Sequence, residues 1–228
     1  MRFNYWQTFY ENSFYHIYNR AIGTDWLFVN NDNHQYFLQK WKKYIHPYMD
    51  TFAYCLMSNH YHFLARVKTV DVAFMQAVAK ENTVASRSYY AGIMTIDDFL
   101  LDQFKRLFSS YALAFNKQQN RHGSLFEESF KRIQISNEVK LLNTLCYIHH
   151  NPIHHQLSPV YDLWTYSSYK SYLSDQPTLL ARQEGLQLFD GLGKDSKAYF
   201  QYHEAYKIAR RSWTRALDWD DDLMTSEK

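Results

Sequence analysis

Three segments in the first third of the chain are rich in aromatic and β-branched residues, a pattern that favours strands. They run over residues 14–20, 51–57 and 60–67, and only Ser58 and Asn59 separate the last two. A fourth strand is expected at the end of 124–135, after a loop. The sequence therefore predicts strands on both sides of a helical middle region.

Apolar residues recur at helical spacing between and after these strands. The predicted helices cover 33–44, 70–80 and 97–119, and a further helix starts after Ser136 or Asn137 and ends at Asn151-Pro152. The alternation of strands and helices predicts an α+β fold, with a ferredoxin-like antiparallel sheet and helices packed on one face.

The pattern changes near residue 174, where short helical stretches replace the alternation. Helices are expected over 182–189 and 194–209, and the acidic run from Asp218 to Asp222 is expected to be a disordered tail. We therefore predict a catalytic domain over residues 1–173 and a small helical C-terminal extension over 174–228.

Composition adds two constraints. Aromatic residues make up 18% of the chain, enough both to build a core and to stack on nucleobases, while a net charge of +2 does not by itself indicate nucleic-acid binding. Cys55 and Cys146 lie in apolar runs and are predicted to be buried free thiols, as in a reducing cytosol. No apolar run reaches the roughly 18 residues of a membrane span. A cytoplasmic protein without a membrane partner is expected.

The clearest chemical pattern is His60-Tyr61-His62 within a predicted strand. Alternate side chains of a strand share a face, so His60 and His62 project together with Leu64 and Arg66. Two imidazoles at this spacing can bind one divalent ion. Two half-exposed histidines without a ligand are the alternative, and the motif alone does not decide between them.

Five segments, in order, resemble the HUH single-strand nucleases, and among them the REP-associated tyrosine transposases. The resemblance covers about residues 13–173, and the segments are FYHIYNRA, CLMSNHYHFLARV, SSYALAFNKQQNRHGSLFEESFKR, YIHHNPIHHQL and WTYSSYKSYL. It implies a ferredoxin-like catalytic domain, a divalent ion (Mg²⁺ or Mn²⁺) and a covalent 5′-phosphotyrosine intermediate.

Carried over by position, the resemblance makes His60 and His62 metal ligands and Tyr111 the nucleophile. The family's third ligand lies four residues after the tyrosine, where this chain has Phe115, so Asn116 is taken for that role. Phosphate contacts are further expected from four basic residues: Arg66, Lys131, Arg132 and Lys170.

The sequence therefore predicts a metal-dependent endonuclease or transposase that cleaves and rejoins hairpin-bearing single-stranded DNA, and it leaves a homodimer open. A non-catalytic DNA-binding protein of the same fold is one alternative. A metal-dependent hydrolase that uses water instead of tyrosine is another. A covalent protein–DNA adduct separates the first reading from both alternatives.

Overall fold

The computed structural model describes residues 4–191 and 196–212, with side chains described as far as Arg210. Four strands form one antiparallel sheet in the order β2-β3-β1-β4. The strands are β1 (Phe14–Arg20), β2 (Met49–Leu56), β3 (His60–Val67) and β4 (Lys131–Ile135). With a helix between β1 and β2 and helices between β3 and β4, this is the order of a ferredoxin-like βαββαβ unit. The four predicted strands are confirmed.

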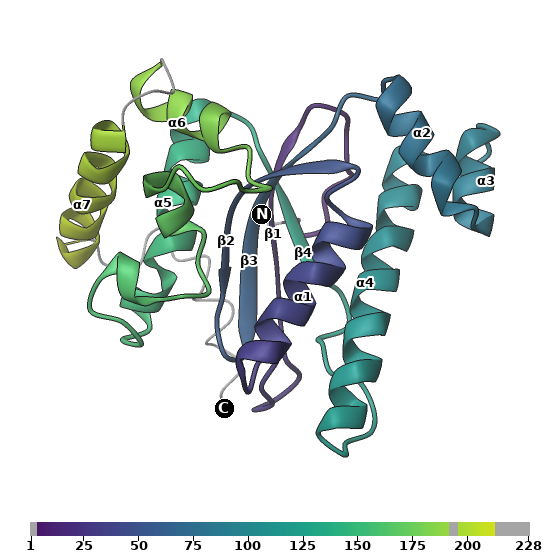
Figure 1. Cartoon of the computed structure of the whole chain (residues 1–228), viewed down its shortest axis with the longest axis horizontal. Coiled ribbons are helices and arrows are strands. Elements are labelled where there is room, and N and C mark those ends of the chain that lie inside the picture. Colours follow the sequence, from purple (N-terminus) through teal and green to yellow (C-terminus); the bar gives the residue numbers. More distant parts are fainter. Residues whose placement is uncertain (1–3, 192–195, 213–228) are drawn as a thin grey trace.

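Two helices, α1 (Asn31–Tyr44) and α4 (Ile96–Gln118), cover one face of the sheet (Figure 1). They bury the aromatic side of β3, where the ring of Trp41 stacks on Phe63 at 3.6 Å between centroids. The helices α2 (Val72–Glu81) and α3 (Val84–Tyr90) project beyond the sheet (Figure 1). The sequence did not predict α3.

The opposite face is also covered, by α5 (Glu138–His154), so the prediction of helices on one face was incomplete. Leu64 and the side chains of α5, among them Leu141 and Leu145, form a second core there. The predicted end at Asn151-Pro152 was wrong. Pro152 lies in the last turn, where it forfeits one backbone bond, and the Asn151 carbonyl still accepts from His155 N at 2.9 Å.

The described residues after α5 extend this second core. Short 3₁₀ turns at η1 (Tyr161–Leu163) and η2 (Tyr169–Leu173) lead to α6 (Arg182–Asp190) and α7 (Ser196–Ser212). Leu186 and Tyr199 are buried with residues of α5, and His203 Nε2 lies 2.9 Å from His149 Nδ1. The described part of the predicted extension contains the helices α6 and α7, and it shares a core with α5. The acidic tail lies outside the described residues.

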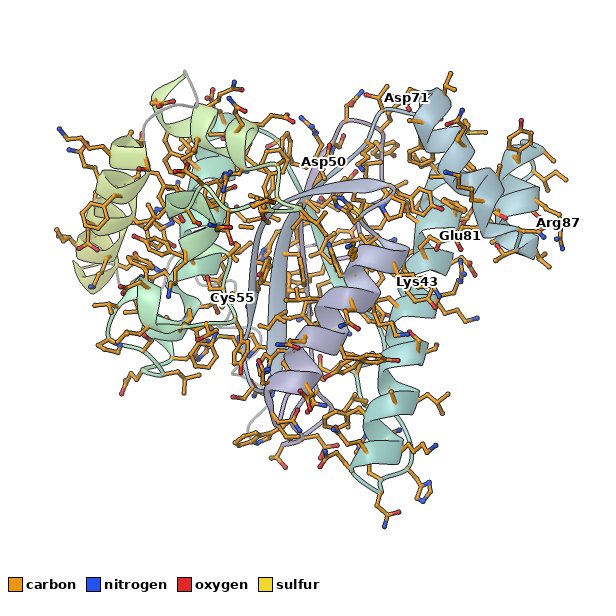
Figure 2. All side chains as sticks on the ribbon, in the orientation of Figure 1. Lys43, Asp50, Cys55, Asp71, Glu81 and Arg87 are labelled. Carbon is orange, nitrogen blue, oxygen red and sulfur yellow. The ribbon has the colours of Figure 1, made fainter. Side chains whose placement is uncertain are left out.

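Both cysteines are free and buried, as predicted. Cys55 lies on the side of β2 that faces α5 (Figure 2), and Cys146 lies on α5 itself. None of the helices in the described part of the chain is long and apolar enough to cross a membrane.

An N-terminal strap, residues 4–7, runs along the free edge of β4. Arg132 N donates to Tyr5 O at 2.7 Å and Gln7 N donates to Arg132 O at 3.2 Å, which makes a short parallel bridge between Trp6 and Arg132. The strap pairs backbone groups that an edge strand would otherwise expose. It also fixes Trp6 beside β4, with half of its surface exposed.

Candidate active site

His60 and His62 lie on the face of β3 that α5 covers. His62 is fully buried, His60 is 8% exposed, and their ring centroids are 5.1 Å apart. The neighbouring strand places His16 beside them, with its Nε2 3.0 Å from His62 Nδ1. His60 and His62 therefore lie on the same side of the sheet, as predicted, and the imidazole of His16 lies beside them.

The hydrogen bonds of the two rings leave their Nε2 atoms for a ligand. His60 Nδ1 lies 2.8 Å from Asn59 Oδ1, which can only accept, so His60 Nδ1 carries the proton. The Nε2 atoms of His60 and His62 are buried without a hydrogen-bond partner. When His62 Nδ1 donates to His16, both Nε2 atoms carry the lone pair that a metal ion requires.

Helix α5 brings a tyrosine and an asparagine to this histidine pair. The ring of Tyr147 packs edge-on against His16 and His62, with centroids 5.7 and 5.6 Å apart. Asn151 lies one helical turn further on and donates Nδ2 to Tyr147 O at 3.1 Å. Its Oδ1 is buried without a hydrogen bond of good geometry, and the side chain raises the pKa of the adjacent His60.

Burial keeps the imidazoles neutral near pH 7. Desolvation, reinforced by the charge of His155, lowers the pKa of His60 to about 3, and Asn151 opposes this effect only in part. Desolvation also lowers the pKa of His16 to about 3 and holds the pKa of His62 well below its usual range. Neutral rings are the form that binds metal ions.

The chemistry of this group fits a divalent ion. Two imidazole Nε2 atoms and the Oδ1 of Asn151 are buried polar atoms that converge from β3 and α5. Across the described residues, no three side chains of His, Cys, Asp or Glu are arranged to bind a metal. A site here therefore needs an amide oxygen, or oxygens supplied by a substrate phosphate, to complete its coordination.

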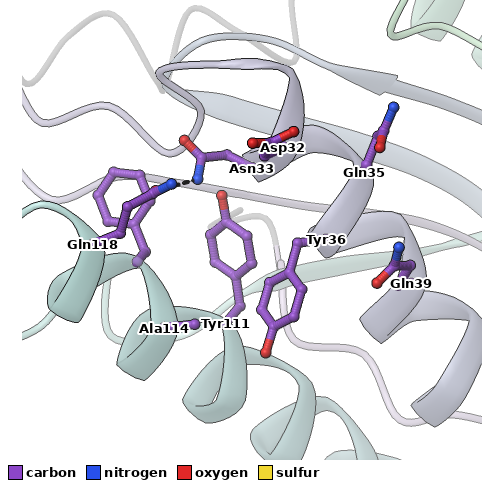
Figure 3. Close-up of a pocket in the computed structure, with 9 residues that line it drawn as sticks. Asp32, Asn33, Gln35, Tyr36, Gln39, Tyr111, Ala114 and Gln118 are labelled. Atoms are coloured by element: carbon purple, nitrogen blue, oxygen red, sulfur yellow. Dashed lines mark hydrogen bonds between the residues drawn. The ribbon is translucent and has the colours of Figure 1, made fainter.

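The structure does not bring Tyr111 to the histidine pair. Tyr111 lies on α4, on the opposite face of the sheet, and its hydroxyl donates to Leu27 O at 2.5 Å. Burial raises the pKa of its phenol, which disfavours the phenolate. Tyr111 forms the floor of a 430 Å³ pocket between α1 and α4, where Asn33 donates to Gln118 (Figure 3). No basic residue lines this pocket.

The structure does not bring Asn116 to the histidines either, because it lies on the same helix as Tyr111. Its Nδ2 donates to Gly123 O at 2.9 Å, and its Oδ1 accepts from Arg121 at 2.7 Å. These bonds tie the end of α4 to the following loop. Asn116 is a structural residue in this arrangement.

The four predicted phosphate contacts have different environments. Arg66 is held between Asp50 and Glu184, and the buried Arg132 donates to Gln7 O at 2.6 Å, so neither guanidinium is available to DNA in this arrangement. Lys170 is exposed on η2, far along the chain from the histidines. Lys131 lies over the rings of Tyr5 and Tyr18, 5.1 and 5.7 Å from their centroids. Lys131 is linked to the histidine pair through Tyr18, because the Tyr18 ring stacks on His16 and His62.

A local signal for the missed residues was present in the sequence. Tyr147 and Asn151 are four residues apart on one predicted helix, the spacing expected of a nucleophilic tyrosine and a third ligand. Tyr111 and Phe115 did not meet that requirement. His16 was equally accessible, since alternation along 14–20 places it on one side with Tyr18.

Comparison with known proteins finds a relative in sequence and a counterpart in fold. The chain is 29% identical over 126 residues to a protein of Haemophilus influenzae described as a REP-associated tyrosine transposase. The match covers 54% of this chain and 61% of that relative.

The fold has a solved counterpart. The structure of a REP-associated tyrosine transposase bound to a REP hairpin superposes with a TM-score of 0.56 at 12% identity, over 78% of this chain and 88% of that one. At this identity the match establishes the shared fold. A scan of protein families found none that matches.

Proposed function

We propose that this protein is a metal-dependent transposase-type endonuclease that cleaves and rejoins single-stranded DNA through Tyr147. The observation that carries the proposal is the convergence of three buried groups, the Nε2 atoms of His60 and His62 and the side chain of Tyr147, from two elements on one face of the sheet. Similarity to the REP-associated tyrosine transposases supports it.

In the proposed reaction, the hydroxyl oxygen of Tyr147 attacks the scissile phosphorus, and the bond from phosphorus to the 3′ oxygen breaks. The 3′-hydroxyl leaves with a proton, and the 5′ phosphate stays esterified to the tyrosine. Because the ester is retained, attack by a second 3′-hydroxyl reverses the step and joins two strands.

The residues of this chain bind and orient the reacting groups. His60 and His62, with Asn151, would hold a divalent ion (Mg²⁺ or Mn²⁺), which supplies positive charge to the scissile phosphate. Asn59 and His16 fix the orientations of the His60 and His62 rings by hydrogen bonds of 2.8 and 3.0 Å. A hydrogen bond to the other nitrogen of a ligating imidazole orients the ring and raises its basicity.

The proposed substrate is single-stranded DNA that carries a hairpin, because the solved counterpart is bound to one. The matched stretch covers only 61% of the curated relative, so the substrate of this chain is a proposal. The aromatic content of this chain is compatible with stacking on unpaired bases.

Incubation of the protein with a hairpin-bearing single strand and Mn²⁺, followed by a denaturing gel, tests the proposal. A covalent adduct is expected, and mass spectrometry should locate the nucleotide on Tyr147. Nicking without an adduct would favour a hydrolase that uses water, and an adduct on another tyrosine would refute the assignment.

A non-catalytic DNA-binding protein is the second candidate, and one observation favours it. His62 is fully buried and Tyr147 is 3% exposed, so the site is closed in this conformation. If the protein binds the hairpin strand but forms no adduct with Mg²⁺ or Mn²⁺, this second function is the correct one.

A further inference from the structure

A cleft lies between the N-terminal strap, α4 and residues 124–130, which precede β4. It has a volume of about 590 Å³, within the usual range for small-molecule sites. It is separate from the pocket at Tyr111 and is not used by the proposed reaction.

Aromatic rings line this cleft. Phe108 lies 5.1 Å from Phe126 and 5.4 Å from Phe130 between ring centroids, so the three rings pack together where they line the cleft. Trp6 lines the cleft from the strap, and half of its surface is exposed. A flat ligand can therefore contact aromatic rings from both the strap and α4.

Hydrogen-bonding groups complete the lining. Asn19, Ser109 and Ser129 contribute polar side chains, and Glu127 and Glu128 contribute carboxylates. The exposed Lys105 and the buried Arg132, which is held by Gln7 O, are the cations of the lining. The carboxylates disfavour a phosphate inside the cleft and favour a ligand that donates hydrogen bonds, such as an exocyclic amino group.

The cleft and the histidine pair are connected through β1. Glu127 N donates to Arg20 O at 3.0 Å, its carboxylate lies 3.6 Å from the Arg20 guanidinium, and Arg20 is the register partner of His60. On the other side of the strap, Lys131 lies over Tyr18, which stacks on His62. A short stretch of DNA could therefore reach both sites.

We propose that this cleft binds one unpaired nucleobase of the DNA strand next to the scissile phosphate, between Trp6 and the Phe108 surface. Lys131 contacts the phosphate between that base and the cleavage site. Adenine, cytosine and guanine carry an exocyclic amino group and an unpaired thymine exposes its N3–H, so Glu128 can accept a hydrogen bond from any of the four bases. This inference rests on the proposed function, and it names how that site selects its substrate.

The test measures binding without cleavage, in the Tyr147→Phe protein with EDTA, by fluorescence anisotropy. A set of hairpin-bearing strands carries an abasic residue at each flanking position in turn. We expect one position at which loss of the base weakens binding about 5- to 100-fold, the range for base–aromatic stacking.

Two variants assign that position to the cleft. The abasic penalty is the fold-loss of affinity when the base at that position is removed. In Trp6→Ala the intact strand should bind more weakly, and the abasic penalty at that position should disappear. Ser109→Trp, which fills the cleft from the exposed side of α4, should have the same effect. Tyr90→Ala removes an exposed ring from α3 and serves as the matched control, with the penalty unchanged.

Each outcome is decisive. If the abasic penalty in Trp6→Ala and Ser109→Trp equals that in the Tyr147→Phe parent, or if no position carries a penalty, the base-binding cleft is refuted. The adduct assay with native Tyr147 is separate. An adduct together with an unchanged penalty refutes the cleft alone, whereas a cleft-specific penalty without any adduct refutes the proposed cleavage alone.

Discussion

Replacement of Tyr147 by phenylalanine should abolish cleavage and leave the fold nearly unchanged. The change removes one oxygen, and the ring keeps its packing against His16 and His62, whose centroids are 5.7 and 5.6 Å away. Loss of one hydroxyl interaction costs about 1 kcal/mol of unfolding free energy. Loss of the nucleophile should lower the cleavage rate by at least about a thousand-fold, which corresponds to about 4 kcal/mol in activation free energy.

Tyr111→Phe is the matched control, because both tyrosines are almost fully buried and lie on opposite faces of the sheet. It removes the hydroxyl that donates to Leu27 O and leaves that carbonyl unpaired, at a cost of about 1–3 kcal/mol. The Tyr111→Phe variant should still cleave DNA, and so should Tyr18→Phe. A denaturing gel measures the adduct and urea denaturation measures stability. Full activity in Tyr147→Phe, or loss of activity in folded Tyr111→Phe, would refute the assignment.

Four further outcomes are expected. Calorimetry should detect Mn²⁺ binding in the native protein and little in His62→Ala, and equal binding would count against the metal site. Asn116→Ala should cleave normally and lose about 1 kcal/mol of stability, since its bonds only tie α4 to a loop; loss of metal binding in this variant would restore its predicted role. Gly185→Ala should lower the melting temperature, because a Cβ would press on the Tyr172 side chain. Overpacking of this kind costs about 1–3 kcal/mol of unfolding free energy. An unchanged melting temperature would show that Tyr172 moves aside. Burial lowers the pKa of His203 to about 3, so the unfolded chain takes up a proton first, near pH 6.5. Stability to urea should therefore fall as pH drops from about 6.5 towards 3, less steeply in His203→Gln, and a rise over that range would contradict the burial.

The sheet was the most predictable part of the fold, because strand alternation is a local property. The bounds of β1 and β3 were predicted to the residue, and with them the shared side of His60 and His62. The strap was not predicted. Its pairing with β4 joins residues more than a hundred positions apart, and a non-local pair leaves no periodic signal in either segment.

Tyr111 was expected beside the histidine pair, and its different position has a physical reason. The apolar stripe of 97–119 indicates which side of that helix is buried, but it carries no information on which face of the sheet the helix covers. Tyr111 and Tyr147 are both buried aromatic residues on helices, and only the three-dimensional arrangement separates them. The spacing of Tyr147 and Asn151 was a usable signal, because a fixed helical rise makes it independent of the tertiary fold.

The sheet separates two groups of side chains that can be altered independently. The α1/α4 side holds one cluster of buried aromatic residues, and the α5 side holds the histidines and Tyr147. Substitutions without shared contacts usually have additive effects on stability. Stabilising changes under α1 and α4 should therefore compensate for costly substitutions beneath α5. Such stabilising changes on the α1/α4 side could be combined with exchanges of the proposed metal ligands on the α5 side.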